Sequence, residues 1–374
     1  MSWHTSRLGD VVTLQRGHDL PEAQRQDGDV PVVSSSGITG SHNEPKAKAP
    51  GVVTGRYGTL GEVFYVEEDY WPLNTALYVT DFKGNHPRFV AYFLQNVLRN
   101  YQSDKAAVPG VNRNVLHELK VRSTDTKSQE KVADILSAYD DLIENNRRRM
   151  ALLEEAARQL YREWFVRLRF PGHEHTPITN GVPEGWERVP TPEAVDINPT
   201  TRLSDQIEHW SVEMADLPTN GMVIQQASKR EGRSGSKFRN GDTLFARITP
   251  CLENGKTAFV DFMDVGEVAR GSTEFIVLRS RRLTQEFVYC LARTYDFREN
   301  AIKSMIGSSG RQRVQESCFD KFLVLVPPST LLSLFTDSVR PVFQQIKVLH
   351  AQNQQLRAAC GLLLPRLMSG EIAV

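Results

Sequence analysis

The stretch that decides the fold reads VADILSAYDDLIENNRRRMALLEEAARQLYREW and occupies positions 132–164. One series of seam residues recurs every seven positions, and a second follows four positions behind it. Together they are Val132, Leu136, Tyr139, Ile143, Asn146, Met150, Leu153, Ala157, Leu160 and Trp164. Apart from Asn146 they are apolar or aromatic. Sustained heptads are typical of a coiled-coil helix, so we expect one long helix over 128–168.

A second stretch, FTDSVRPVFQQIKVLHAQNQQLRAACGLLLPRL at positions 335–367, repeats this pattern. Each of its seam residues lies 203 positions after a seam residue of the first stretch. They are Phe335, Val339, Val342, Ile346, Leu349, Asn353, Leu356, Cys360, Leu363 and Leu367. A helix of this length spans roughly 60 Å at about 1.5 Å per residue. That exceeds the width of a small domain, which favours a coiled coil over an ordinary buried helix pair.

A globular head precedes each helix, and the two heads also match loosely. The segment 3–12 matches 186–195, while 75–79 and 89–94 match 273–277 and 287–292 at an offset of 198. Short β-branched and aromatic runs punctuated by glycine predict strands in both heads, and 86–100 and 284–299 have helical spacing. We therefore expect an α+β fold with a pseudo-two-fold internal repeat and two antiparallel coiled-coil helices. The expected parts are a first head (1–127), a first helix (128–168), a linker (169–184), a second head (185–328), and a second helix with its tail (329–374).

The composition narrows the class of protein. Lys and Arg together number 45, as do Asp and Glu, so the net charge is zero and any DNA-binding surface must be a local basic patch balanced elsewhere. The four cysteines form no CxxC pair, which indicates reduced thiols and predicts no zinc or other metal site. The sequence shows no signal peptide and no apolar run long enough for a membrane span. We therefore expect a cytoplasmic protein that has no contact with a membrane.

Local motifs for catalysis are missing from the sequence. There is no P-loop and no HExxH metal motif. The run at 198–201, Asn-Pro-Thr-Thr, is the nearest approach to an amino-methyltransferase motif, but the second proline and the aromatic residue are absent. We therefore expect no catalytic residues and no cofactor in this chain.

Two arginines at matching places in the heads are candidates for base reading. Arg56 and Tyr57 lie in the turn Gly55-Arg56-Tyr57-Gly58, and the equivalent position in the second head is Arg247, followed by Lys256. A guanidinium group in the major groove can bond two acceptors of guanine. A plain hairpin turn explains the same residues equally well.

Further polar clusters suit contact with phosphate or base edges. Ordinary polar loops, turns and solvated basic loops are the competing interpretations. The remaining candidate residues are Ser34, Ser35, Ser36, His42, Asn112, Arg113, Lys229, Arg230, Lys237, Arg239, Ser308, Ser309, Arg311 and Arg313.

Four motifs together resemble the specificity subunit of type I restriction–modification enzymes. They are Trp3-x-x-x-x-Leu8-Gly9-Asp10, Gly55-Arg56-Tyr57-Gly58, the run 135–146 (ILSAYDDLIENN) and the segment 364–372 (LPRLMSGEI). The resemblance implies that the heads are target-recognition domains, each reading one half of a split double-stranded DNA target. It also implies spacer helices that pair antiparallel.

The resemblance further implies docking of two methyltransferase subunits, which would carry S-adenosylmethionine, and of motor-nuclease restriction subunits in the full complex. The second head departs from the pattern because Phe245-Ala246-Arg247-Ile248 replaces the Gly-Arg-Tyr-Gly turn. Two rivals remain: a stand-alone enzyme, and a two-headed scaffold that binds proteins. Salt-dependent DNA binding would separate recognition from scaffolding.

The two asparagines of the seams predict the helix register. A buried amide beside an apolar partner is penalised, whereas two facing amides can bond each other. Antiparallel helices that pair Asn146 with Asn353 would place Tyr139 against Cys360 and Leu153 against Ile346.

Overall fold

The computed structural model describes residues 3–56, 61–99, 101, 112–308 and 310–374. Tyr57 and Ser309, two of the candidate residues, lie outside these ranges. The chain forms two compact units: the first comprises Met1–Glu144 and Gln354–Val374, and the second comprises Asn145–Asn353. The division into units therefore cuts through both long helices, so each unit contains one head and part of each helix.

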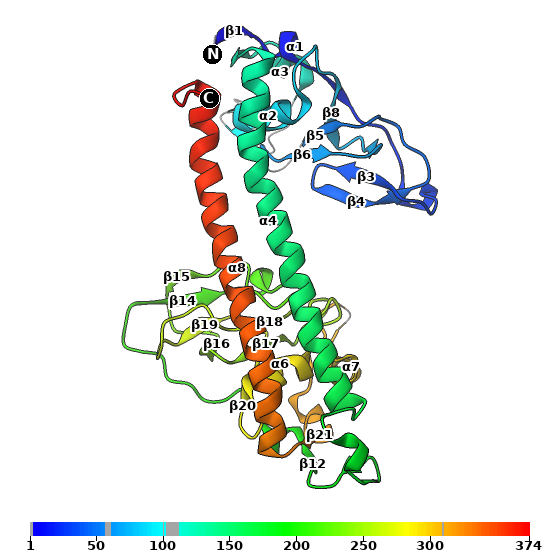
Figure 1. Ribbon diagram of the computed structural model, residues 1–374, viewed down its shortest axis with the longest axis vertical. Coiled ribbons are helices and arrows are strands. Elements are labelled where there is room, and N and C mark those ends of the chain that lie inside the picture. Colours follow the sequence, from blue (N-terminus) through cyan, green and yellow to red (C-terminus); the bar gives the residue numbers. More distant parts are fainter. Residues whose placement is uncertain (1–2, 57–60, 100, 102–111, 309) are drawn as a thin grey trace. The chain divides into compact units, whose positions relative to one another are not determined.

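The two long helices are present near the expected bounds (Figure 1). Helix α4 spans Thr126–Tyr161 and passes into a π-helical turn, η2, at Arg162–Val166, while α8 spans Ser329–Ser369. Asp125 caps α4, since its carboxylate accepts hydrogen bonds from the amide and the hydroxyl of Ser128 at 3.0 and 2.9 Å. These bonds lower the pKa of Asp125 to about 2. The same bonds cap the first turn of the helix.

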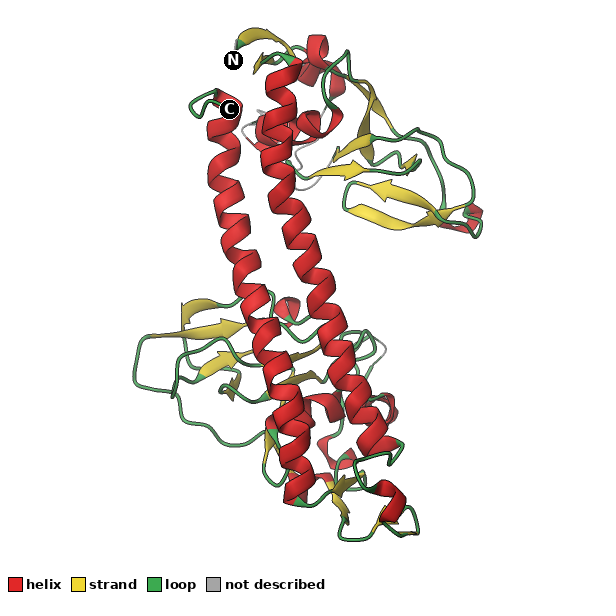
Figure 2. Ribbon diagram, viewed as in Figure 1, coloured by secondary structure: helices red, strands yellow, loops and turns green. Residues whose placement is uncertain are grey.

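Short strands build the head of the first unit, as Figure 2 shows. A four-stranded sheet has the order β2-β8-β5-β6, a smaller sheet has the order β4-β3-β7, and β1 pairs with β9. The elements are β1 (His4–Arg7), α1 (Leu8–Val11), β2 (Thr13–Arg16), η1 (Glu22–Gln24), β3 (Val30–Ser34), β4 (Gly37–His42), β5 (Gly51–Gly55), β6 (Val63–Val66), β7 (Trp71–Pro72), β8 (Ala76–Asp81), α2 (Pro87–Arg99), α3 (Arg113–His117) and β9 (Lys120–Ser123).

The head of the second unit repeats this plan. Its sheet β13-β20-β17-β18 matches β2-β8-β5-β6, β12 pairs with β21 as β1 pairs with β9, and a further sheet has the order β15-β14-β19-β16. A hairpin of β10 and β11 occupies the expected linker. The elements are η3 (His173–His175), β10 (Ile178–Thr179), β11 (Val182–Pro183), β12 (Glu187–Pro190), α5 (Thr191–Ala194), β13 (Val195–Ile197), β14 (Glu208–Val212), η4 (Met214–Asp216), β15 (Ser228–Glu231), β16 (Ser236–Phe238), β17 (Thr243–Ala246), β18 (Thr257–Phe259), β19 (Ala269–Gly271), β20 (Phe275–Ser280), α6 (Gln285–Ala292), α7 (Tyr295–Lys303), η5 (Glu316–Cys318) and β21 (Leu323–Val326).

Two details of the repeat differ from the sequence prediction. The sheet ladders pair Gly55 with Ala76 and Ala246 with Phe275, so β8 and β20 match at an offset of 199 rather than 198. The helix expected over 284–299 is two helices, because α6 ends at Ala292 and Thr294 caps α7 by accepting a hydrogen bond from the amide of Phe297. A side-chain cap of this kind starts a new helix in an apolar pattern that reads as continuous.

Apolar residues of both long helices lie in the core of each unit. In the first unit, Val132 and Leu136 of α4 share a core with Leu364 and Leu367 of α8 and with α2. In the second unit, Ala157 and Tyr161 share a core with Phe335, Val339 and Ile346 and with α6.

The helix segments of the second unit run antiparallel. Tyr161 contacts Phe335 with ring centroids 6.2 Å apart, whereas Asn146 Nδ2 donates to Asn353 Oδ1 at 3.0 Å. Both amides are nearly fully buried. The pair therefore has the geometry that the seam pattern anticipates. Among the described residues, no helix is both long and apolar enough to cross a membrane.

Candidate nucleic-acid interface

Arg56 and Arg247 occupy equivalent places in the two heads. Each follows the last residue of a central strand, β5 or β17. The Arg56 amide donates to the carbonyl of Thr75, and the Arg247 amide donates to that of Glu274, both at 3.0 Å. The two residues therefore occupy the same position in the ladder of the duplicated sheet.

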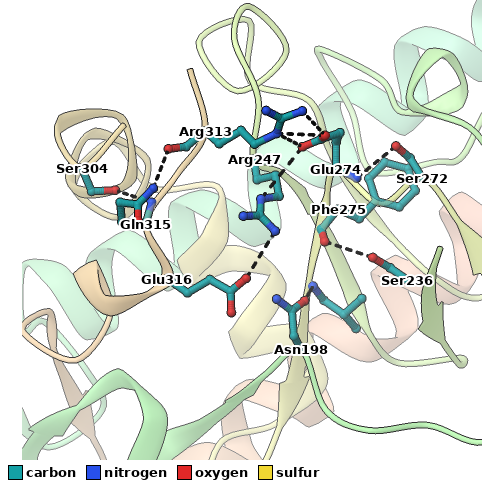
Figure 3. Close-up of polar contacts among 11 residues, drawn as sticks. Asn198, Ser236, Arg247, Ser272, Glu274, Phe275, Ser304, Arg313, Gln315 and Glu316 are labelled. Atoms are coloured by element: carbon teal, nitrogen blue, oxygen red, sulfur yellow. Dashed lines mark hydrogen bonds and ion pairs between the residues drawn. The ribbon is translucent and has the colours of Figure 1, made fainter. Parts of the chain in front are cut away.

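In the second unit, Arg247 belongs to a network of charged groups (Figure 3). Its Nη1 lies 3.5 Å from Glu316 Oε1, and its Nε lies 4.0 Å from Glu274 Oε2. Glu274 also accepts bonds from Arg313, whose Nη2 and Nε lie 2.7 and 2.9 Å from Glu274 Oε1. The cluster thus consists of Arg247 just after β17, Glu274 just before β20, Glu316 of η5 and Arg313 of the segment before η5.

Electrostatics hold this cluster in its charged form. The hydrogen bond from Arg313 lowers the pKa of Glu274, aided by the positive charges of Arg313 and Arg247. The same contact raises the pKa of Arg313. Two guanidinium groups are consequently positioned by carboxylates before any ligand arrives, and the Arg313 side chain remains nearly half exposed. Guanidinium groups held in this way can donate hydrogen bonds to a phosphate or a base edge.

In the first unit, Arg56 Nη1 donates to the backbone carbonyl of Asn74 at 3.2 Å. The side-chain amide of Asn74 in turn donates to Asp19 Oδ1. Thr75 occupies the place that Glu274 has in the second unit, so the carboxylate at that position is specific to the second head.

A cluster of His18, His42, Lys46 and Trp71, here the Trp71 cluster, lies on the same head. The rings of His18 and His42 meet Trp71 edge-on at 6.4 and 5.2 Å, and Lys46 Nζ lies 5.5 Å from the Trp71 ring. Burial and the charge of Lys46 lower the pKa of His18, which favours the neutral form of its ring. Of these four residues, sequence reasoning singled out His42 alone, because the others come from segments that only the fold brings together.

The serine-rich run is a hairpin turn between β3 and β4. Ser34 is buried, and its hydroxyl donates to the carbonyl of Gly37 at 3.2 Å and accepts from the Ser36 amide at 3.1 Å. Ser35 and Ser36 form the two-residue turn, with Ser36 exposed. The bonds of Ser34 are thus internal, and the buried His42 likewise accepts from the Gln26 amide at 3.1 Å. These contacts favour a structural role for Ser34 and His42.

The basic stretch of the second head is paired with acidic residues. Lys229 and Arg230 of β15 lie 3.9 Å from Glu267 and 3.4 Å from Glu213. Lys229 also lies 5.2 Å from the Trp210 ring. Lys237 is half-buried on β16, and Arg239 is exposed just beyond it. Exposed ion pairs of this kind are weak, about 0–1 kcal/mol, so a phosphate could displace the acidic partners.

The remaining candidates lie on turns. Asn112 caps α3 by accepting from the Asn114 amide at 3.0 Å, and Arg113 next to it is exposed. Ser308 and Arg311 are exposed in the matching turn of the second head, and the Arg311 amide donates to the Ser308 carbonyl at 3.0 Å. Lys256 donates to the Met214 carbonyl at 2.6 Å and is half-buried. Among the described candidates, Arg247 and Arg313 form ion pairs with a shared partner, Glu274.

Comparison with known proteins shows what this chain resembles. Residues 1–155 match the family described as type I restriction modification DNA specificity domain. This first part of the chain is therefore similar to the DNA specificity domain of type I restriction–modification enzymes. Over a longer segment the chain is 23% identical across 295 residues to the MjaIX specificity subunit of Methanocaldococcus jannaschii, a match covering 73% of this chain and 65% of that protein.

A second relative is more similar over a shorter segment. The EcoEI specificity subunit of Escherichia coli is 32% identical over 156 residues, which cover 40% of this chain and 26% of that protein. The matches thus span less than two thirds of either relative. The crystal structure of a type I restriction–modification S subunit from M. genitalium has the same fold, with a TM-score of 0.58 at 13% identity, covering 98% of this chain and 96% of that one. The predicted α+β fold with two long packed helices is thereby confirmed.

Proposed function

We propose that this chain is the sequence-reading, non-catalytic subunit of a type I restriction–modification complex in the cytoplasm. Each head reads one half of a split duplex target. The spacer helices hold the heads and bind two methyltransferase subunits, which carry S-adenosylmethionine, together with motor-nuclease subunits in the full complex.

The observation that carries this proposal is the duplicated arginine. Two heads of one topology each present an arginine at the same edge of the same sheet. Arginine is the side chain most suited to bidentate contact with guanine, and a repeated reader fits a target with two half-sites. The match of residues 1–155 to a DNA specificity domain makes DNA the ligand to test first.

Adenine methylation mapping tests the proposal. We expect the chain, combined with its methyltransferase, to direct methylation to a two-part sequence with an unread gap. The purified chain alone should transfer no methyl group from S-adenosylmethionine to DNA. A contiguous methylated sequence, or methylation by the chain alone, would contradict the proposal.

The scaffold alternative predicts a different binding experiment. A reader of DNA should lose affinity steeply as salt rises, because each phosphate contact releases counterions. A scaffold for proteins should show no binding to duplex DNA at any salt concentration.

A further inference from the structure

A hollow in the first unit lies between α2, β6 and the unit's segments of α4 and α8. Its volume is about 410 Å³, and its walls include Tyr65, Ala91 and Asp140. Cavities of roughly 300–1,000 Å³ accommodate small-molecule ligands. All lining residues belong to the first unit.

The internal repeat shows what this hollow lacks. In the second unit, Phe259, Tyr289 and Phe343 pack ring against ring, with centroids 5.1 to 6.0 Å apart. The helix offsets of 198 and 203 place Ala91 where the second unit has Tyr289, and Asp140 where it has Phe343. The hollow is therefore the space of two missing aromatic rings.

The third ring position is retained. Tyr65 pairs with Val52, and Phe259 pairs with Thr243. Val52 and Thr243 each lie three residues before the end of their strand, so Tyr65 occupies the place of Phe259. Tyr65 thus keeps an aromatic wall beside that of Tyr92, and a planar ring can stack against it.

The charges around this space are reversed between the units. The second unit has buried carboxylates at Glu154 and Glu286. Tyr289 donates to Glu154 at 2.6 Å, and Arg340 lies 2.9 Å from Glu286. At the two matching positions the first unit has Arg357 and Arg88, both of which line the hollow.

The guanidinium groups outnumber the carboxylates on these walls. Among the described residues that line the hollow, Arg88, Arg99 and Arg357 are accompanied by one carboxylate, that of Asp140, which accepts from the Tyr92 hydroxyl at 2.6 Å. Arg88 is held by Glu67 and Asp141 at 3.0 and 2.8 Å and lies 5.2 Å from the Tyr65 ring. A ligand that fits this site carries a flat ring system and a negative charge.

We propose that this hollow is a binding site for a purine nucleoside monophosphate. The two-ring base takes the space of the two absent side chains and stacks on Tyr65, while Gln95 and Asp140 offer polar atoms to its edge. The phosphate lies against the guanidinium groups, which match its oxygens in pairs. The site is separate from the DNA-reading residues and does not depend on the proposed function.

Calorimetric titration of the full chain with AMP, adenosine and inorganic phosphate tests this site. We expect saturable binding of one AMP with a Kd below about 1 mM. Adenosine and phosphate should each bind at least about tenfold more weakly, because each lacks one half of the recognised chemistry. If phosphate bound as tightly as AMP, the base would add nothing to the affinity, and the proposal that a base occupies the hollow would be wrong.

Two variants and one matched control locate the site. Ala91→Tyr restores the side chain found in the second unit and should abolish AMP binding, whereas Ala91→Ser, which keeps the space open, should retain it. Arg357→Gln should weaken AMP binding at least about tenfold, with the thermal unfolding midpoint of each variant showing that it is folded. Absence of saturable AMP binding, or binding unchanged in both Ala91→Tyr and Arg357→Gln, would overturn the proposal.

Discussion

The two units use one architecture but differ in what surrounds equivalent positions. Arg247 is held among carboxylates, whereas Arg56 has Thr75 at the place of Glu274 and bonds a backbone carbonyl. The rings packed between α6 and the long helices of the second unit are replaced by a polar hollow in the first. Duplication thus preserves the backbone frame, while the side chains on it can diverge in charge and volume.

Exchange of the second head offers the strongest test of this independence. Replacing residues 185–325 with the second head of another family member should change one half of the target completely, and leave the other half unchanged. Loss of one set of base contacts lowers preference for the original half-site by about 10³-fold or more. Methylation mapping of the hybrid measures both halves, and a change in both would show that the heads do not read independently.

Removal of an aromatic ring from the core of the second unit should lower the free energy of unfolding far more than a change at the matching residue of the first unit. Tyr289→Ala should lower the free energy of unfolding by about 3–5 kcal/mol, since it empties a fully buried site. Ala91→Gly at the matching position should cost only about 1 kcal/mol, the helix-propensity difference. Urea denaturation of both variants gives the two values, and equal losses would mean that the hollow is packed as tightly as the aromatic core.

The asparagine pair tests the register of the helices. Asn146→Leu should lower the free energy of unfolding by about 1–3 kcal/mol, because Asn353 is left buried without its amide partner. The double variant with Asn353→Leu should recover most of that loss, which denaturation measures. No recovery in the double variant would indicate that the amides act separately and do not specify the register.

Much of the fold follows from the sequence for a simple reason. Seam residues such as Leu136 and Phe335 repeat at a spacing that only a helix satisfies, so local pattern and tertiary packing agree. The division of 284–299 into two helices was missed because the cap at Thr294 acts through one side-chain bond within an apolar run.

The candidate site was less accessible to sequence reasoning. Arg247 could be found through the repeat, but Glu274 and Glu316 carry no local motif that links them to it. The Trp71 cluster and the hollow likewise depend on segments far apart in the chain.

Arg56→Ala distinguishes reading from positioning in the first head. If Arg56 bonds a base, specific binding should weaken by about 1–3 kcal/mol with relaxed preference at one base pair. Titrations of specific and unrelated duplexes at several salt concentrations measure this. An unchanged sequence preference with a weaker salt dependence of binding would indicate that Arg56 contacts a phosphate. No effect on either quantity would indicate that the segment is a plain turn.

The smallest effect is expected for Glu274→Gln in the second head. The pKa of Glu274 lies below its ordinary value of 4.5, so its ion pairs stabilise the folded protein above that pH and lose this effect as the pH falls through the lowered pKa. Because Arg313 is nearly half exposed, the variant should lose about 1 kcal/mol or less at neutral pH. Denaturation at neutral and acidic pH should show the difference shrinking in acid, and a pH-independent difference would assign the loss to packing.

The division of the chain into units has a consequence for the order of synthesis. The second unit is one continuous segment, Asn145–Asn353, whereas the first begins at the N-terminus and is completed by Gln354–Val374. Leu364, Leu367 and Met368 are buried in the core of that first unit. The last part of the first unit is therefore translated only after the whole of the second unit, so the core of the first unit can be completed only once the second unit has been synthesised.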